Sequence, residues 1–135
     1  MDGIREKDGK KLALRYVSFG DSQLVKSTAA AMQKMLKDLG VDLSIVEKPS
    51  SEFSRVFADR DFDVVTMSIT SSEPFGVTYF KYTYGSDSQV NKSGTGTPEL
   101  DEQIAELEKL PTQEEQIQKA NELEKEALKQ YGIMP

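Results

Sequence analysis

The sequence predicts an α/β fold in which a short, mostly parallel sheet carries helices on both faces and is followed by a C-terminal helical hairpin. Segments with strand and helix periods alternate over residues 11–69, the links between them are short, and two capped amphipathic helices follow residue 97. Right-handed crossovers make three such strands parallel in one sheet. A chain of 135 residues holds one modest core, so we expect a single unit with residues 1–10 as its linker or edge.

The first strand is expected at residues 11–18, where apolar and polar positions alternate with period 2. A turn at residues 20–22 then precedes a helix of four to five turns that ends at Gly40. We expect its buried face to consist of the apolar residues that recur at helical spacing, which are Leu24, Val25, Thr28, Met32, Met35, Leu36 and Leu39.

The second strand is expected at residues 41–46 and the third at residues 63–69. Between them, residues 49–51 supply a turn and a candidate N-cap for a short helix that carries Phe53, Val56 and Phe57. Residues 71–96 keep no apolar period for long, and no element is predicted there.

Two helices complete the chain as an αα-hairpin. Thr97 and Pro98 open the first, whose buried stripe is Leu100, Ile104 and Leu107, and Pro111 ends it. Residues 112–115 form a capping box for the second helix. Its inward positions are expected to be Ile117, Ala120, Leu123, Ala127, Leu128 and Tyr131.

Composition narrows the function. The 17 basic and 23 acidic residues give a net charge of −6, which disfavours nucleic acid and anionic membrane surfaces as partners. The sequence has neither histidine nor cysteine, so most catalytic constellations are excluded and we expect a binding protein without cofactor, not an enzyme. The sequence contains no run of about 18 apolar residues, so no membrane span is predicted. Its start lacks an apolar leader, so no signal peptide is predicted in it either.

The candidate site lies at the carboxyl ends of the three strands, because ligands of open α/β sheets bind there. The segments at residues 18–22, 48–51 and 69–75 are rich in hydroxyl groups, which suits holding a polar solute. Ordinary loop and capping roles remain the alternative for each residue. The candidate solute-binding residues are Ser18, Phe19, Thr66, Ser68, Ile69, Thr70, Ser71, Ser72, Glu73 and Phe75.

The sequence contains three further patterns: an aromatic cluster, a glycine-rich stretch and an acidic alternation. The aromatic residues Phe75, Tyr79, Phe80, Tyr82 and Tyr84 suit either a solute pocket or, as the favoured reading, local core under a loop. The glycine-rich stretch 93–97 lacks the features of a phosphate loop and is read as a turn before a capped helix. The alternating Asp59, Asp61 and Asp63 lack the other calcium ligands at the required spacing, so we expect no metal.

Several motifs, in order, resemble the family 5 extracellular solute-binding proteins, which are the oligopeptide- and dipeptide-binding components of ABC importers. They cover nearly the whole chain: residues 7–12, 35–43, 61–64, 91–94, 98–101, 116–126 and 133–135. The resemblance implies one C-terminal lobe of a type II periplasmic-binding-protein fold, the whole chain being a fragment of a two-lobe protein.

The resemblance also implies a function and partners. These are a small solute, most often a peptide, a missing N-terminal lobe, the permease subunits of an ABC transporter, and a location outside the cell or in the periplasm, often as a lipoprotein. Peptide-binding relatives usually carry a tryptophan and an acidic residue after the third strand. Here Glu73 is the one nearby acid, so either it contacts the solute's ammonium group or the solute is no ordinary peptide. The alternative function is a stand-alone receiver-like or protein-interaction domain.

Overall fold

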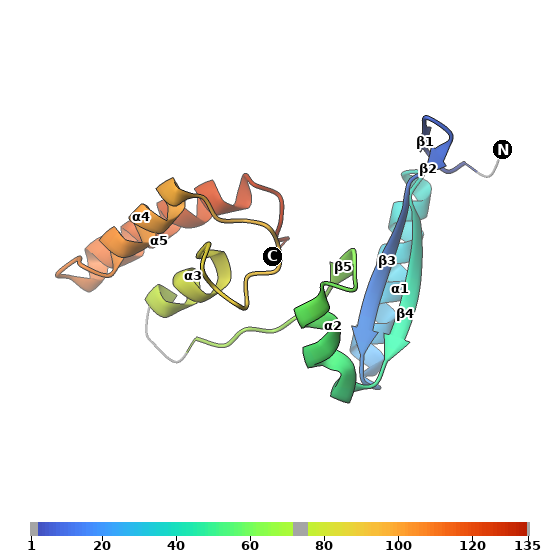
Figure 1. The fold of residues 1–135 in the computed structure, drawn as a ribbon, viewed down its shortest axis with the longest axis horizontal. Helices are drawn as coiled ribbons and strands as arrows, with labels where there is room; N and C mark the ends of the chain where they lie inside the picture. Colours follow the sequence, from blue (N-terminus) through green and yellow to red (C-terminus); the bar gives the residue numbers. More distant parts are fainter. Residues whose placement is uncertain (1–2, 72–75, 135) are drawn as a thin grey trace. The chain divides into compact units, whose positions relative to one another are not determined.

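The computed structural model describes residues 3–71 and 76–134. The chain divides into two compact units, Met1–Met67 and Ser68–Pro135, which we call unit 1 and unit 2. In Figure 1, unit 1 runs from blue to green and unit 2 from yellow-green to red. Each unit is described by itself, and the assignment of the whole chain to one lobe of a larger protein stays a prediction.

The sheet of unit 1 has three parallel strands, as predicted. β3 (Ala13–Phe19) lies in the centre, between β4 (Asp42–Lys48) and β5 (Val64–Val65). Ala13 pairs with Asp42 and the register continues to Phe19 and Lys48, while Tyr16 pairs with Val64 on the other side. All three carboxyl ends therefore point to the same edge of the sheet.

β5 is much shorter than the strand predicted at residues 63–69. β3 is its one neighbouring strand among the described residues, and their pairing ends at Val17 and Val65. Thr66, Met67 and Ser68 are exposed and follow no regular structure. The prediction of a third parallel strand is confirmed, but its length is wrong, because only Val64 and Val65 pair with β3.

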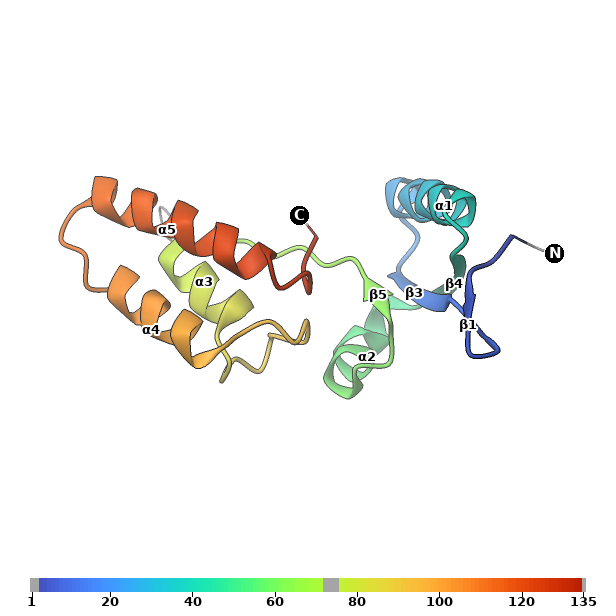
Figure 2. The same ribbon diagram turned by 90° about the horizontal axis from the view of Figure 1, so that it is seen from above.

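Helices cover both faces of this sheet, as predicted (Figure 2). α1 (Gln23–Asp38) packs on the face of Tyr16 and Leu43, where Ala29 is buried and Met32 and Leu36 are partly buried. α2 (Phe53–Asp59) covers the other face, which carries Val17 and Phe19 of β3. Because β3 alternates its side chains between the faces, one strand anchors both helices.

The buried face predicted for α1 is partly wrong. Leu24, Met35 and Leu39 are 76%, 61% and 57% exposed, respectively, and Thr28 is exposed as well. The helix has an apolar arc wider than one sheet face covers, so only half of it reaches the core.

Short elements frame the sheet. β1 (Glu6–Lys7) and β2 (Lys10–Lys11) form an exposed antiparallel hairpin within the segment expected as linker or edge. The 3₁₀ helix η1 (Ser50–Glu52) leads into α2 without a side-chain cap hydrogen bond, so the N-cap role expected of the serines after Pro49 is wrong.

Unit 2 contains the predicted helical hairpin of α4 (Pro98–Leu107) and α5 (Gln113–Leu128). The Thr97 and Thr112 hydroxyls accept hydrogen bonds from the backbone N–H groups of Leu100 and Glu115, which confirms both caps. The buried residues of the two helices are Leu100, Ile104, Leu107, Ala120, Leu123 and Ala127. Two predicted inward positions are wrong, because Ile117 is 40% exposed and Tyr131 lies past the end of α5 and is 91% exposed.

α3 (Val77–Tyr84) lies in the segment for which no element was predicted. Its aromatic and β-branched residues favour strands, so packing against the hairpin, not propensity, holds it helical. Phe80 and Tyr84 are buried in the core of unit 2, whereas Tyr82 is exposed. Burial raises the pKa of the Tyr84 hydroxyl to about 12. The aromatic cluster is thus mainly local core, and Phe75 lies outside the described residues.

Candidate functional site

The carboxyl ends of β3 and β4 meet, as predicted, at one edge of the sheet. Phe19 and Lys48 are register partners, and the Gly20 N–H donates to the Lys48 carbonyl at 3.2 Å. Gly20 has a φ of +74°, and a Cβ on it would lie 3.0 Å from Ser50 Oγ. A glycine is therefore needed where the loops after Phe19 and Lys48 leave the sheet together. We call the polar surface formed by these two loops and the strand ends before them the strand-tip surface.

Ser18 is the most informative residue of this surface. Its side chain is 3% exposed, and its hydroxyl has no hydrogen-bond partner among the described residues. Leaving a buried hydroxyl unpaired costs about 1–3 kcal/mol. Proteins keep such groups rarely, so the Ser18 hydroxyl marks the strand ends as a candidate binding position.

Thr66, which follows β5, uses its hydroxyl within unit 1. Thr66 Oγ1 lies 2.6 Å from the hydroxyl of Tyr16, a residue that is 1% exposed. Because Val65 pairs with Val17, Thr66 stands one position further along the strand direction, level with Ser18. Three predicted site residues, Ser18, Phe19 and Thr66, therefore belong to the same edge of unit 1.

A row of phenylalanines runs from the tip of β3 along α2. Phe19 meets Phe53 edge to face at a ring-centre distance of 5.1 Å, and Phe53 stacks on Phe57 at 5.4 Å. Phe57 stacks in turn on Phe62 at 6.0 Å, and all four rings are half-buried. Phe53 was not among the predicted site residues. Its contact with Phe19 depends on how η1 turns the chain after Pro49, so no spacing in the sequence points to it.

The charged groups near the strand tips neutralise each other. Glu52 accepts a hydrogen bond from Arg55 at 2.6 Å and lies 3.4 Å from Lys48 Nζ. Arg55 first, and then Lys48, hold the pKa of the Glu52 carboxyl below its usual value, so it stays ionised. Lys26 is similarly shared between Asp21 and Glu47, at 3.6 Å from each. The strand-tip surface thus offers neutral hydroxyls and rings.

The remaining predicted residues belong elsewhere. Ser68, Ile69, Thr70 and Ser71 begin unit 2 and lie in no helix or strand; Ile69 is half-buried and the others are exposed. Ser72, Glu73 and Phe75 lie outside the described residues. The third predicted segment is therefore divided between unit 2 and residues that the structure does not describe.

Asp61 and Asp63 of the acidic alternation form an ion-pair cluster with Arg15. Arg15 Nη1 donates to Asp61 at 2.9 Å, and the backbone N–H of Arg15 donates to Asp63 at 2.7 Å. Within the described ranges, no three potential metal ligands gather as a metal site. Nor, over the same residues, is any helix long and apolar enough to cross a membrane.

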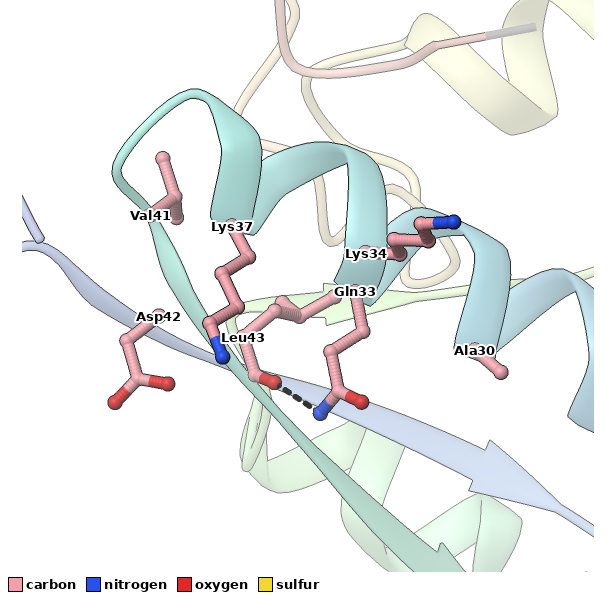
Figure 3. Close-up of a pocket in the computed structure, with 7 residues that line it drawn as sticks. All are labelled: Ala30, Gln33, Lys34, Lys37, Val41, Asp42 and Leu43. Carbon is pink, nitrogen blue, oxygen red and sulfur yellow. Dashed lines mark hydrogen bonds between the residues drawn. The ribbon is translucent and has the colours of Figure 1, made fainter. Parts of the chain in front are cut away.

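The groove in Figure 3 lies away from the strand tips. It has a volume of about 390 Å³ and runs between α1 and the start of β4, beside Gln33, Lys34, Lys37 and Asp42. The strand tips lie at the opposite end of β4, at Lys48. No predicted site residue lines this groove.

Comparisons with known proteins found matches by structure and not by sequence. No protein-family model matches the chain, and no curated protein matches it. The nickel ABC transporter structure from Bacillus halodurans superposes with a TM-score of 0.80 and 22% identity over 98% of this chain. The oligopeptide-binding protein AppA from Bacillus subtilis, solved with a nonapeptide, gives 0.76 and 20% identity over 97%.

The murein tripeptide-binding protein MppA from Escherichia coli gives a TM-score of 0.78 and 23% identity over 93% of the chain. The chain spans 28%, 26% and 25% of these three structures, or about a quarter of their length. The fold predicted from the sequence is confirmed: these neighbours are family 5 solute-binding proteins, and the chain has the fold of a single lobe of a periplasmic binding protein.

Proposed function

We propose that this chain is one lobe of the solute-binding protein of an ABC importer, and that it closes with a second lobe around a small solute. The fold match to importer binding proteins supports the class of function. The single observation that carries the site is Ser18, whose buried hydroxyl has no partner at the strand-tip surface. A protein built only for stability gains nothing from such a group.

The proposed mechanism is a hinged clamp. A solute that touches both lobes only when they are closed shifts the open–closed equilibrium towards the closed form, because its affinity for the two forms differs. In this scheme Ser18 hydrogen-bonds the solute, and Phe19 with Phe53 borders an apolar side chain of it. The transporter's permease subunits then bind the closed form.

For the solute we propose a peptide. Hydroxyl donors suit the neutral polar groups of a peptide main chain, and the row of half-buried rings suits its apolar side chains. Glu73 is proposed as the partner of the peptide's ammonium group. The structural neighbours differ here, since one is a nickel transporter protein while the others bind a nonapeptide and a murein tripeptide, so a metal complex is the competing outcome.

A periplasmic or extracellular location, with a lipid anchor on the complete protein, belongs to the same proposal. It follows from the kind of importer to which the structural neighbours belong. Mass spectrometry of the intact exported protein would detect the added mass of a lipid. An unmodified cytoplasmic product would contradict both parts.

The decisive experiment is mass spectrometry of solute that co-purifies with the complete protein, followed by calorimetric titration of that solute. We expect Ser18→Ala to weaken binding by about three- to tenfold, the equivalent of one neutral hydrogen bond. Ser54→Ala, on the exposed side of α2, is the matched control and leaves affinity unchanged. Equal affinity of the Ser18 variant and the parent would remove Ser18 from the site.

The 135-residue chain by itself offers a second test. Because half of the proposed site belongs to another lobe, we expect calorimetry to detect no tight binding of a peptide by this chain alone. Tight binding would contradict the clamp. A natural gene that ends near Pro135 would instead favour a stand-alone interaction domain.

A further inference from the structure

Helix α1 carries two apolar strips, and only one of them packs on the sheet. Its inner strip, which includes Ala29, Met32 and Leu36, packs on the sheet. A second strip runs beside it at helical spacings of four, three, four and four residues, so it forms one continuous ridge. This outer ridge consists of Leu24, Thr28, Ala31, Met35 and Leu39, all of them exposed.

The orientation of α1 fixes where the outer ridge faces. Gln33 Nε2 donates to the Leu43 carbonyl of β4 at 2.6 Å, as drawn in Figure 3, and Lys26 lies 3.6 Å from Glu47 of the same strand. These contacts hold the polar flank of α1 against the outer edge of β4. The outer ridge is on the opposite flank and therefore faces the β3–β5 side of the sheet.

The face of the sheet on that side has room for another element. Val64 of β5 belongs to the same cluster as Tyr16 and Leu43 but is only partly buried. No second helix lies beside α1 on this face among the described residues of unit 1. From Leu24 to Leu39 the ridge is about 22 Å long, the length of a second helix of four turns laid alongside.

We infer that the outer ridge of α1 is the docking surface for an amphipathic helix of the same polypeptide, contributed by a part of the protein outside these 135 residues. This inference rests on the proposed function, in which the chain is one lobe of a longer protein. The structures that share the fold are about four times as long as this chain, so such a protein has ample further sequence.

The size of the ridge favours an attached helix over a separate protein. Three large side chains and two small ones cannot bury the roughly 1,000 Å² of a specific interface between independent proteins. A segment of the same chain needs less contact, because the covalent link gives it an effective concentration on the order of millimolar. The same argument disfavours a second copy of the chain.

The absence of cysteine from the sequence allows a direct test by thiol labelling. Ala31→Cys and Met35→Cys place a thiol on the outer ridge, and Ala30→Cys places one on the opposite, polar flank, which is also exposed. Each variant is labelled with a maleimide in the 135-residue chain and in the complete protein, and the modified peptide is quantified by mass spectrometry.

We expect all three thiols to react at similar rates in the 135-residue chain. In the complete protein the two ridge thiols react at least about tenfold more slowly, while the Ala30→Cys thiol is unaffected. Equally fast labelling of the ridge in the complete protein overturns the inference. The inference is also overturned if the two ridge thiols already react more slowly than the Ala30→Cys thiol in the 135-residue chain, at any protein concentration. Solute titration of the complete protein is read separately, so failure of the docking inference is distinguishable from failure of the clamp.

Discussion

The two units differ in how much of their apolar surface is buried and in how many of their helices have side-chain caps. Unit 2 encloses a continuous core between α3, α4 and α5, and both helices of its hairpin carry side-chain caps. In unit 1 the core against α1 is small, α1 and α2 lack side-chain cap hydrogen bonds, and a ridge of apolar residues faces solvent. Unit 2 therefore buries more of its apolar side chains internally than the α1 side of unit 1 does.

Buried polar residues show the same contrast. In unit 2 the Asn91 side-chain amide donates to the carbonyls of Gly85 and Thr95, at 3.1 and 2.6 Å. The hydroxyl of Thr83 is buried without a partner there, but it lies within α3, where a rotation about χ1 lets a threonine reach the carbonyl four residues back. Ser18 lies one residue before the end of β3, and its buried hydroxyl has no partner among the described residues.

Truncating the core of unit 2 is the change with the largest expected effect. Leu123 is fully buried, so Leu123→Ala should lower the free energy of unfolding of unit 2 by about 2–5 kcal/mol through lost burial and a cavity. Leu24→Ala, on the exposed ridge of unit 1, should change stability by less than about 0.5 kcal/mol. Hydrogen exchange of amides in each unit measures both. An equal loss of unfolding free energy in the two leucine variants would contradict the contrast between unit 2 and unit 1.

The helix caps give the next largest difference. Thr97→Ala removes the acceptor for the Leu100 N–H and should cost about 1 kcal/mol, measured by urea unfolding. Ser22 occupies the corresponding N-cap position of α1 but makes no side-chain cap hydrogen bond, so Ser22→Ala should be close to neutral. A comparable loss in the Ser22 variant would mean that α1 is capped in solution.

Ser18→Ala should raise stability, whereas the substitutions above lower it or leave it unchanged. Removing an unpartnered buried hydroxyl should raise the free energy of unfolding of the 135-residue chain by about 0.5–1 kcal/mol, even though the same change weakens solute binding in the complete protein. Ser44→Ala on β4 is the control, because that hydroxyl is exposed and donates to the Leu14 carbonyl. Destabilisation by Ser18→Ala in thermal unfolding would show that the hydroxyl already has a partner.

The sequence was most informative where structure depends on local chemistry. Thr97, Pro98 and Thr112 define both helices of the hairpin, and the stripe of Leu100, Ile104 and Leu107 is buried as predicted. It was least informative where distant contacts decide. α3 is held helical by its packing on the hairpin, the pairing of β5 with β3 covers two residues only, and the buried side of α1 depends on which flank meets β4.

For the site, the same division holds. Parallel strands bring Ser18 and Phe19 to one edge by a general rule of α/β sheets, so these residues were predictable. The contact of Phe53 with Phe19 depends on how η1 turns after Pro49, which no spacing in the sequence reveals. Whether Ser18 finds an internal partner is likewise a matter of packing alone.

The ion-pair cluster of unit 1 gives the smallest expected effect and a distinct pH dependence. Hydrogen bonding to Arg15 and its charge hold the pKa of Asp61 below its usual value near 3.8. A depressed pKa in the folded state means that the pair stabilises the fold above the unfolded-state pKa, and that this contribution is lost as the pH falls through the lower folded-state value. Both partners are exposed, so the contribution is small.

Urea unfolding between pH 2.5 and 5, a window of about one pH unit on either side of the usual aspartate pKa, tests this pair. The loss of stability in acid should be shallower in Asp61→Asn than in the parent. Asp87→Asn in unit 2 should follow the parent. Identical acid slopes for all three proteins would mean that the Arg15 pair does not hold β5 to β3 in solution.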